Sequence, residues 1–356
     1  MHEALDIYCG EKALKKIHKN GFHFNDVKVM VGASGGAKWL SLSRLDQVLF
    51  PEILKNRKDP LFCLGSSIGT WRFACAAQKN PAAAFRKFEE TYINYVYSKP
   101  ITTKSILLDS YDILEKTIGD DGLEQALNHD IIRTSIMAVK SKGLLKFEDR
   151  FLLPIGLLAA ALSNVVSRKL LGLYMKRALF SDSRNLPPFY DMRGFPIEKF
   201  CLAKNNFKDA ILASSSIPMF MDGIKNIKGA TSGVYRDGGF IDYHFDLSFL
   251  GEEDGLVLYP HFFNKITPGW FDKHISWHGP SPKNYENTIV ICPSTEFVRK
   301  LPGGKIPDRS DFKNYSENER ISNWKRVTSE TDRMADDFMS IVDKSEWAKR
   351  AKPLFR

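Results

Sequence analysis

The sequence predicts an α/β fold built on a mainly parallel β-sheet. Short apolar runs with the character of buried strands alternate with segments of helical periodicity, and glycine-rich loops separate them. The chain has 356 residues, of which 43% are hydrophobic and 26% are charged. This is ordinary globular usage, which supplies a sizeable core and excludes a disordered, collagen-like or coiled-coil chain.

The alternation of strands and helices is clearest between residues 27 and 78. The apolar runs 27–31 and 61–64 predict two buried strands. Each is followed by a helical segment, 37–49 with apolar residues at helical spacing and 70–78 with many small residues. Strand, helix, strand and helix in this order favour parallel pairing of the strands.

The rest of the chain adds strands and a long unassigned stretch. Runs 134–139, 255–259 and 288–292 predict further strands, and the charged periodic stretch 316–349 predicts exposed helix. The length allows two domains or one large domain. We expect a single domain over residues 1–356, in which residues 100–198, where no motif is found, form a cap or membrane-contacting insertion.

Residues 151–167 form the most hydrophobic segment, and basic residues flank it on both sides within 140–177. The run is shorter than the ~20 apolar residues of a transmembrane helix, and it contains Pro154. Two interpretations stay open. The segment is either a helix that lies in the interface of an anionic membrane or a core helix or lid over a hydrophobic cleft.

Charge and cysteine usage bound the partners and the compartment. The formal net charge of +9 favours acidic partners, but no Lys/Arg block typical of nucleic-acid binding is present, so we expect no nucleic-acid partner. Five scattered cysteines without a CxxC pair favour reduced thiols over disulfides or zinc. The N-terminus does not resemble a signal peptide, so we expect a cytoplasmic protein, with peripheral membrane contact depending on 140–177. The oligomeric state is not indicated.

Residues 65–69, Gly-Ser-Ser-Ile-Gly, match the pattern G-x-S-x-G. In that pattern the serine, here Ser67, lies on a sharp strand-to-helix turn, and the flanking Gly65 and Gly69 relieve crowding. The turn is followed by a helix N-terminus, where backbone N–H groups favour negative charge. The alternative is a Gly/Ser turn without chemistry, but the predicted strand before it and helix after it favour a nucleophile.

A second glycine loop, residues 32–38, follows the first predicted strand. It fails as a phosphate-binding P-loop because Ala37 and Trp39 stand where that pattern requires Gly and Ser/Thr. The adjacent Gly35 and Gly36 allow a ligand to approach closely and can direct N–H groups at one oxygen, as an oxyanion hole requires. The alternative is a simple helix-entry turn.

An aspartate beside two glycines, Asp237-Gly238-Gly239, is the candidate base. A serine hydroxyl is a weak nucleophile until a base takes its proton. The alternative for this tripeptide is an ordinary hairpin turn. Other candidate bases are the downstream histidines, His244, His261, His274 and His278. None lies in a recognisable motif, and only one predicted strand precedes that of Ser67, unlike in α/β-hydrolases. We therefore predict that Asp237 is the base.

In their order, four motifs resemble the patatin-like phospholipases: GASGGAKW at 32–39, GSSIG at 65–69, ASSSIP at 213–218 and DGG at 237–239. The resemblance covers more than half of the chain. It implies a three-layer α/β/α fold with a mainly parallel central sheet. It also implies a Ser–Asp catalytic dyad that needs no histidine, and hydrolysis of lipid acyl esters without metal or cofactor.

The resemblance assigns roles to individual residues. Ser67 would be the nucleophile and Asp237 the base, with an oxyanion hole formed by the N–H groups of Gly35, Gly36 and Ile68. The remaining motif residues would shape the loops; they are Gly32, Lys38, Gly65, Gly69, Gly238 and Gly239.

The glycine loop departs from the usual family pattern D-G-G-G-x-R/K-G. Ala33, Ser34 and Trp39 replace its aspartate, its first glycine and its last glycine. Both central glycines are kept, and Lys38 fills the basic position. The departure puts the shape of the loop in question.

We therefore predict a lipid acyl hydrolase of the phospholipase A type, with a lipid or phospholipid substrate. Two alternatives stay open. One is a non-catalytic lipid- or membrane-binding protein on the same fold, and the other is a hydrolase of non-lipid esters or thioesters. The sequence does not determine the head group, the acyl length, or whether water or an alcohol accepts the acyl group.

Overall fold

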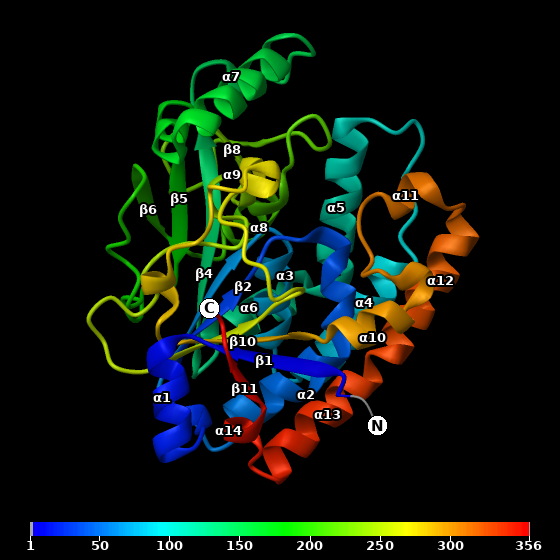
Figure 1. Cartoon of the computed structure of the whole chain (residues 1–356). Helices are drawn as coiled ribbons and strands as arrows, with labels where there is room; N and C mark the ends of the chain where they lie inside the picture. The colour runs from blue at the N-terminus through cyan, green and yellow to red at the C-terminus, as the bar shows by residue number, and fades with distance from the viewer. Residues whose placement is uncertain (1–2, 356) are drawn as a thin grey trace.

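A β-sheet runs through the computed structural model, which describes residues 3–355 (Figure 1). The strands within these residues are β1 (Leu5–Cys9), β2 (Val27–Gly32), β3 (Leu61–Ser66), β4 (Ile132–Ser141), β5 (Met175–Ser181), β6 (Ile197–Cys201), β7 (Ile224–Lys225), β8 (Val234–Asp237), β9 (Leu256–Pro260), β10 (Thr288–Pro293) and β11 (Ala351–Pro353).

Helices connect the strands and cover the sheet. The α-helices are α1 (Glu11–Asn20), α2 (Ser43–Leu54), α3 (Ile68–Ala76), α4 (Pro81–Ile93), α5 (Thr103–Thr117), α6 (Gly119–Asn128), α7 (Leu152–Val166), α8 (Phe207–Ser215), α9 (Gly239–Asp242), α10 (Thr295–Lys300), α11 (Asp311–Asn314), α12 (Glu317–Glu330), α13 (Asp332–Asp343) and α14 (Trp347–Arg350). The 3-10 helices are η1 (Phe24–Asp26), η2 (Gly36–Ser41), η3 (Gly143–Lys146), η4 (Arg168–Leu173), η5 (Trp270–His274), η6 (Pro282–Tyr285) and η7 (Pro302–Gly304).

The sheet has the order β11-β1-β10-β9-β2-β3-β4-β5-β6, and β8 pairs with β4 away from this path. Its middle strands, from β10 to β4, are all parallel. They are almost wholly buried, as is expected of strands covered on both faces. The predicted α/β class with a mainly parallel sheet is confirmed.

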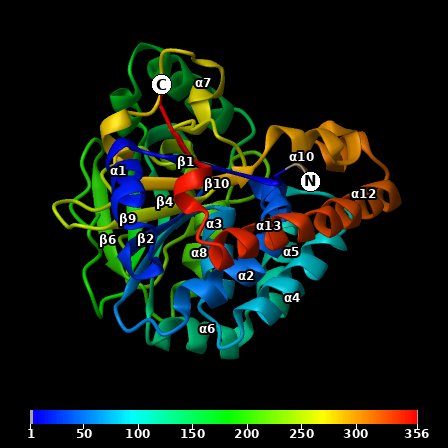
Figure 2. The same cartoon turned by 60° about the horizontal axis from the view of Figure 1, so that its bottom comes forward.

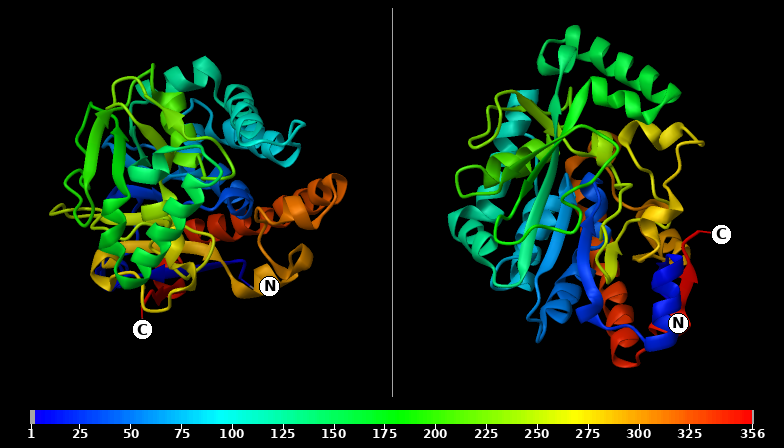
Figure 3. Two further views of the ribbon diagram at one scale, coloured as in Figure 1. Left: turned by 90° about the horizontal axis from the view of Figure 1, so that it is seen from above. Right: turned by 90° about the vertical axis from the view of Figure 1, so that its left-hand side faces the viewer.

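The sheet lies between two outer layers (Figures 2 and 3). Helices α2 to α6 and α8 cover one face, and α13 packs on α2. The other face carries α1 and the segment between β8 and β10. Residues far apart in the sequence therefore meet above the carboxyl ends of the parallel strands.

The predicted strands occur where expected, but two predicted helices differ in detail. The helix expected over 37–49 is a 3-10 helix, η2, followed by α2, because the chain turns tightly after the glycine loop before it settles into α-helix. The stretch 316–349 forms chiefly α12 and α13 instead of one exposed helix. Both bury an apolar stripe that includes Trp324 and Phe338.

The stretch 100–198, which we expected to form a cap or membrane-contacting insertion, does not form one separate unit. Its strands β4 and β5 belong to the central sheet, and α5 and α6 pack against the helical layer. Only η3, α7 and η4, residues 143–173, project beyond the sheet (Figure 1). The apolar runs of β4 and β5 give the physical reason, because such strands are buried between neighbouring strands and covering helices.

Two glycines bring β2 and α3 into direct backbone contact. A Cβ on Gly69 would lie 2.1 Å from the carbonyl oxygen of Gly32. That contact is far below van der Waals distance, and its partner is backbone rather than a movable side chain. Glycine at position 69 therefore lets the turn after β3 lie close to the loop after β2.

We expect Gly69→Ala to lower the free energy of unfolding by about 1–3 kcal/mol, as overpacking of a close contact does. Chemical denaturation measures the change. Gly279→Ala is the matched control, because a Cβ at Gly279 would meet nothing within 4 Å. Equal stability of the two variants would contradict the close contact.

Candidate active site

Ser67 lies on a sharp turn between β3 and α3. Its backbone has φ 54° and ψ −125°, a conformation that a residue with a side chain adopts at a cost of about 1–3 kcal/mol. Its amide donates a hydrogen bond to Ser214 Oγ (2.8 Å), and the Ser214 hydroxyl donates to the Met137 carbonyl (2.6 Å). Hydrogen bonds to residues of α8 and β4 thereby stabilise the strained turn, which has the form of a nucleophile elbow.

The carboxylate of Asp237 faces this serine. Ser67 Oγ donates a hydrogen bond of 2.8 Å to Asp237 Oδ2, and both residues are buried. The other carboxylate oxygen, Oδ1, accepts the N–H of Gly239 at 2.7 Å. Asp237 ends β8 instead of lying in a hairpin turn, so its orientation is set by the sheet and by the start of α9.

Strand β4 brings the two side chains together. Met137 of β4 pairs with Ser66, the residue before the nucleophile, in parallel register. The next residue, Ala138, pairs with Asp237 in antiparallel register. A Cβ on Gly238 would lie 2.1 Å from the Met137 carbonyl oxygen, so glycine lets β8 end directly against β4.

Burial makes Asp237 an unusually basic carboxylate. Desolvation raises its pKa from 3.8 to about 6, although the hydrogen bonds from Gly239 and Ser67 and the more distant positive charges of Arg309 and Lys273 lower it in part. A base with a pKa closer to neutrality takes a proton more effectively than an ordinary carboxylate. The electrostatics therefore suit a proton acceptor that stays ionised at neutral pH.

The glycine loop lies beside the serine. Gly35 and Gly36 line the same cavity as Ser67, and Gly36 has a positive φ of 56°. A Cβ on Gly35 would lie 2.4 Å from the ring of Phe262. Within residues 3–355, the N–H groups of Gly35, Gly36 and Ile68 donate no hydrogen bond. These amides are available to a ligand oxygen.

Ser34 and Trp39, the residues on either side of the two loop glycines, have packing roles. The Ser34 hydroxyl donates to Ser66 Oγ (2.9 Å), and the Ser34 amide donates to the Tyr243 carbonyl (2.9 Å), which ties the loop to the elbow. Trp39 is buried and stacks on Phe88, with ring centroids 4.3 Å apart. The departures from the family pattern thus anchor the loop.

The four candidate histidines do not contact the serine. Ser67 Oγ directs its hydrogen bond to Asp237, and in the part of the chain that the structure describes no histidine lines its cavity. His244 and His261 are buried, and burial lowers the pKa of both, to about 4 for His261. His278 contacts Asp272 instead.

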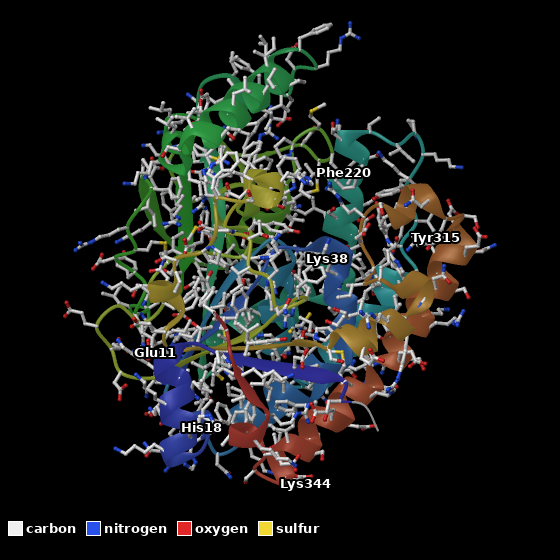
Figure 4. All side chains as sticks on the ribbon, in the orientation of Figure 1. Glu11, His18, Lys38, Phe220, Tyr315 and Lys344 are labelled. Carbon is white, nitrogen blue, oxygen red and sulfur yellow. The ribbon has the colours of Figure 1, made fainter. Side chains whose placement is uncertain are left out.

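Two cavities meet at Ser67. One, of about 80 Å³, is bounded by the glycine loop, Asp237 and three basic residues. The other, of about 110 Å³, is mainly aromatic; its lining includes Trp71, Phe88, Tyr92, Tyr97, Phe220 and Phe312. Both include Ser67 and Ile217 in their walls. Figure 4 labels Lys38 and Phe220, one from each cavity, which lie in the same part of the molecule although they are distant in sequence.

The three basic residues of the smaller cavity are Lys38, Lys273 and Arg309. Among the described residues, none of them has a carboxylate within ion-pair distance. Desolvation, together with the charges of Lys38 and Arg309, lowers the pKa of Lys273 to about 8. Desolvation likewise lowers the pKa of Lys38. An anion in this cavity would relieve this repulsion.

Sequence motifs led to most of this site but not to all of it. Ser67, Ile68, Asp237 and both loop glycines come together, whereas Lys273 and Arg309 lie outside any motif. Lys273 belongs to η5, and Arg309 precedes α11. Their only signal in the sequence was the basic net charge. Among residues 3–355, no group of three or more His, Cys, Asp or Glu side chains is placed to hold a metal ion.

Comparisons with known proteins add little. No protein-family model and no curated protein sequence matches the chain. Among solved structures, human GIVD cytosolic phospholipase A2 aligns with 98% of this chain and 66% of its own, at 12% identity and a TM-score of 0.37. Its complex with methyl gamma-linolenyl fluorophosphonate and terbium chloride gives 11% identity, the same TM-score and 67% of its own chain. This chain thus spans about two thirds of the length of that protein.

We expect Asp237→Asn to become more stable relative to the wild type as pH rises through about 6. Because the pKa of Asp237 is higher in the folded than in the unfolded state, the wild-type fold loses stability as pH rises from about 4 to about 6. The loss amounts to at most about 3 kcal/mol. Asparagine does not ionise, so the Asp237→Asn variant does not lose this stability.

Thermal unfolding at several pH values, of both proteins and of the exposed-site control Asp254→Asn, measures this difference. A gap between Asp237→Asn and wild type that does not change with pH would show that Asp237 ionises normally in the fold.

Proposed function

We propose that this chain is a serine carboxylic ester hydrolase that cleaves lipid acyl esters, a patatin-like phospholipase of the A type, with Ser67 as nucleophile and Asp237 as base. The observation that carries the proposal is the 2.8 Å hydrogen bond from Ser67 Oγ, on its strained turn, to the buried Asp237 carboxylate. Ser67 lies in the walls of two cavities, and its hydroxyl is hydrogen-bonded to a carboxylate of raised pKa. Nucleophilic catalysis needs this arrangement of a nucleophile and a base.

Acylation begins when Ser67 Oγ attacks the ester carbonyl carbon and its proton passes to Asp237 Oδ2. The carbonyl oxygen becomes an oxyanion, which the N–H groups of Gly35, Gly36 and Ile68 bind in our proposal. One such donor typically contributes about 3 kcal/mol to transition-state stabilisation. The carbon–oxygen bond to the alcohol then breaks, and protonated Asp237 gives its proton to that oxygen.

Deacylation repeats these steps with a second nucleophile. Water, or an alcohol in a transacylation, attacks the acyl group on Ser67 and gives its proton to Asp237. The tetrahedral adduct collapses, and Ser67 Oγ leaves and regains the proton. The same two side chains therefore serve both halves of the cycle, so a histidine is not needed in this scheme.

The two cavities support a lipid ester that carries an anionic group. The aromatic cavity offers an apolar surface for an acyl chain. The smaller cavity, which also reaches Ser67, offers Lys38, Lys273 and Arg309, and Arg309 lines both cavities. A phosphate or carboxylate near the scissile ester would supply the negative charge with which these three cations can pair.

We expect a fluorophosphonate probe to label the wild-type protein and to leave Ser67→Ala unlabelled, because the probe reacts with an activated serine. The same samples are assayed on p-nitrophenyl esters from acetyl to palmitoyl. Ser67→Ala and Asp237→Asn should each lose at least about 10³-fold in kcat/KM. Turnover should rise with chain length as the aromatic cavity fills.

Absence of labelling in buffer and in detergent would refute the proposal and leave a non-catalytic lipid-binding protein. Labelling with a preference for acetyl esters would retain the hydrolase and reject the lipid substrate. Near-normal activity of Asp237→Asn would refute the role of Asp237 as the base.

The basic cavity generates a separate prediction. Lys273→Met should raise KM about 10-fold for a phospholipid with an anionic head group, since one charged hydrogen bond contributes roughly 1.5–3 kcal/mol. The KM for an uncharged p-nitrophenyl ester should change little. Lys300→Met, at an exposed lysine of α10, is the matched control. An equal change for both substrates would contradict recognition of an anion.

A further inference from the structure

Helix α7 lies outside the layers of the fold. It forms the top of the molecule in Figure 1 and projects beyond the sheet in the right-hand view of Figure 3. Its 15 residues extend about 22 Å at 1.5 Å per residue. Among residues 3–355, no helix, α7 included, is both long enough and apolar enough to cross a bilayer.

The helix is apolar on both of its faces. The inner face buries Leu153, Gly156 and Ala160, and α7 packs against η3 and η4. The opposite face repeats every three or four residues and exposes large apolar side chains; they are Phe151, Ile155, Leu158, Leu162 and Val165, which are 44–61% exposed. The inner face already supplies the packing that holds α7 on the protein. The outer face is an exposed apolar stripe that the fold does not need.

Flanking side chains extend this apolar face. Phe147 and Leu173, on either side of α7 in the sequence, are 49% and 67% exposed. Soluble proteins rarely expose contiguous apolar surface of this kind unless it meets a partner.

Free positive charges surround the stripe. Lys146 and Arg150 precede it and Lys169 follows it; all three are exposed, and among the described residues none is in an ion pair. The two acidic residues nearby are engaged. Glu148 pairs with Arg236 (2.8 Å), and Asp149 accepts the amides of Phe151 and Leu152 at the start of α7. The net charge around the stripe is therefore positive.

A buried carboxylate joins α7 to the rim of the active site. Asp272 Oδ1 accepts a hydrogen bond from Asn164 of α7 (2.7 Å), and Oδ2 lies 2.7 Å from Nε of Arg168. Its neighbours Trp270 and Lys273 line the cavity of Ser67. The contacts of Asp272 thereby hold α7 at a defined position relative to the cavity of Ser67.

We propose that the outer face of α7 is a membrane-docking surface that inserts into one leaflet of an anionic lipid bilayer. The apolar stripe enters the boundary between head groups and acyl chains, and Lys146, Arg150 and Lys169 contact anionic head groups. The charge complementarity favours this occupant over a second copy of the chain, because two like-charged faces would repel each other. Docking goes beyond the hydrolase proposal and does not require catalysis.

The test is co-sedimentation of the whole chain with vesicles of phosphatidylcholine alone or mixed with phosphatidylglycerol. The wild type should bind the mixed vesicles at least about 10-fold more tightly, and high salt should weaken that binding. Leu158→Ser combined with Leu162→Ser should lower binding at least about 10-fold, since two leucine side chains that enter the bilayer in our proposal are lost. Both side chains point into solvent, so the fold should be unaffected.

Leu186→Ser is the matched control, because Leu186 is 67% exposed but lies far from α7. It is close in sequence to Arg184, whose side chain donates a hydrogen bond to the His129 carbonyl. That contact lies near the end of β5 that is farther from α7. It should bind vesicles as the wild type does. Hydrogen exchange of the wild-type chain gives a second measurement, in which residues 151–166 should gain protection when mixed vesicles are added.

Other results would overturn the proposal. These are no vesicle binding by the wild type, equal binding by the leucine double variant, or a wild-type dimer in solution that this variant converts to monomer. Ser67→Ala separates the two proposals. Loss of labelling with retained vesicle binding supports both, while vesicle binding by a wild-type chain that fluorophosphonate does not label keeps docking and refutes the hydrolase.

Discussion

The pairing of β4 with two different strands is the constraint on which the rest of the site depends. Met137 holds the end of β3 in parallel register, and Ala138 holds the end of β8 in antiparallel register. Two chain segments 170 residues apart therefore deliver Ser67 and Asp237 to one point. Close backbone contacts at Gly69 and Gly238 permit this convergence, since a side chain at either position would push the segments apart.

Burial changes the acidity of the carboxylate that lies at this point. The same desolvation that raises the pKa of Asp237 destabilises its charged form, so the fold retains a base that costs stability at neutral pH. The strained backbone of Ser67 is a second such cost. Hydrogen bonds from Ser214 and within the glycine loop hold both features in place. Strain and a perturbed pKa that coincide at one cavity indicate a functional site.

Ser67 lies between two cavities of different chemistry. Lys38 and Lys273 line only the smaller one, Arg309 lines both, and the larger one is mainly aromatic, so cationic and apolar surfaces meet at the serine. The exposed face of α7 presents the same two chemistries, apolar and cationic, on a larger scale. Asp272 connects the two places through Asn164 and through η5. The proposed membrane-docking surface and the proposed substrate cavity are thus connected through one buried carboxylate.

The sequence by itself determined the α/β class, the positions of the central strands, and Ser67, Asp237 and the glycine loop as candidates. These depend on local signals: apolar runs, turn glycines and a short motif. It did not determine that β5, within the stretch 100–198, is a sheet strand, nor that Lys273 and Arg309 meet at the cavity. Such facts depend on pairing and packing between distant segments, for which no local pattern exists. Whether the apolar segment 151–167 is core or surface was likewise decided only by the tertiary structure, because α7 is apolar on both faces and packing alone selects which face is buried.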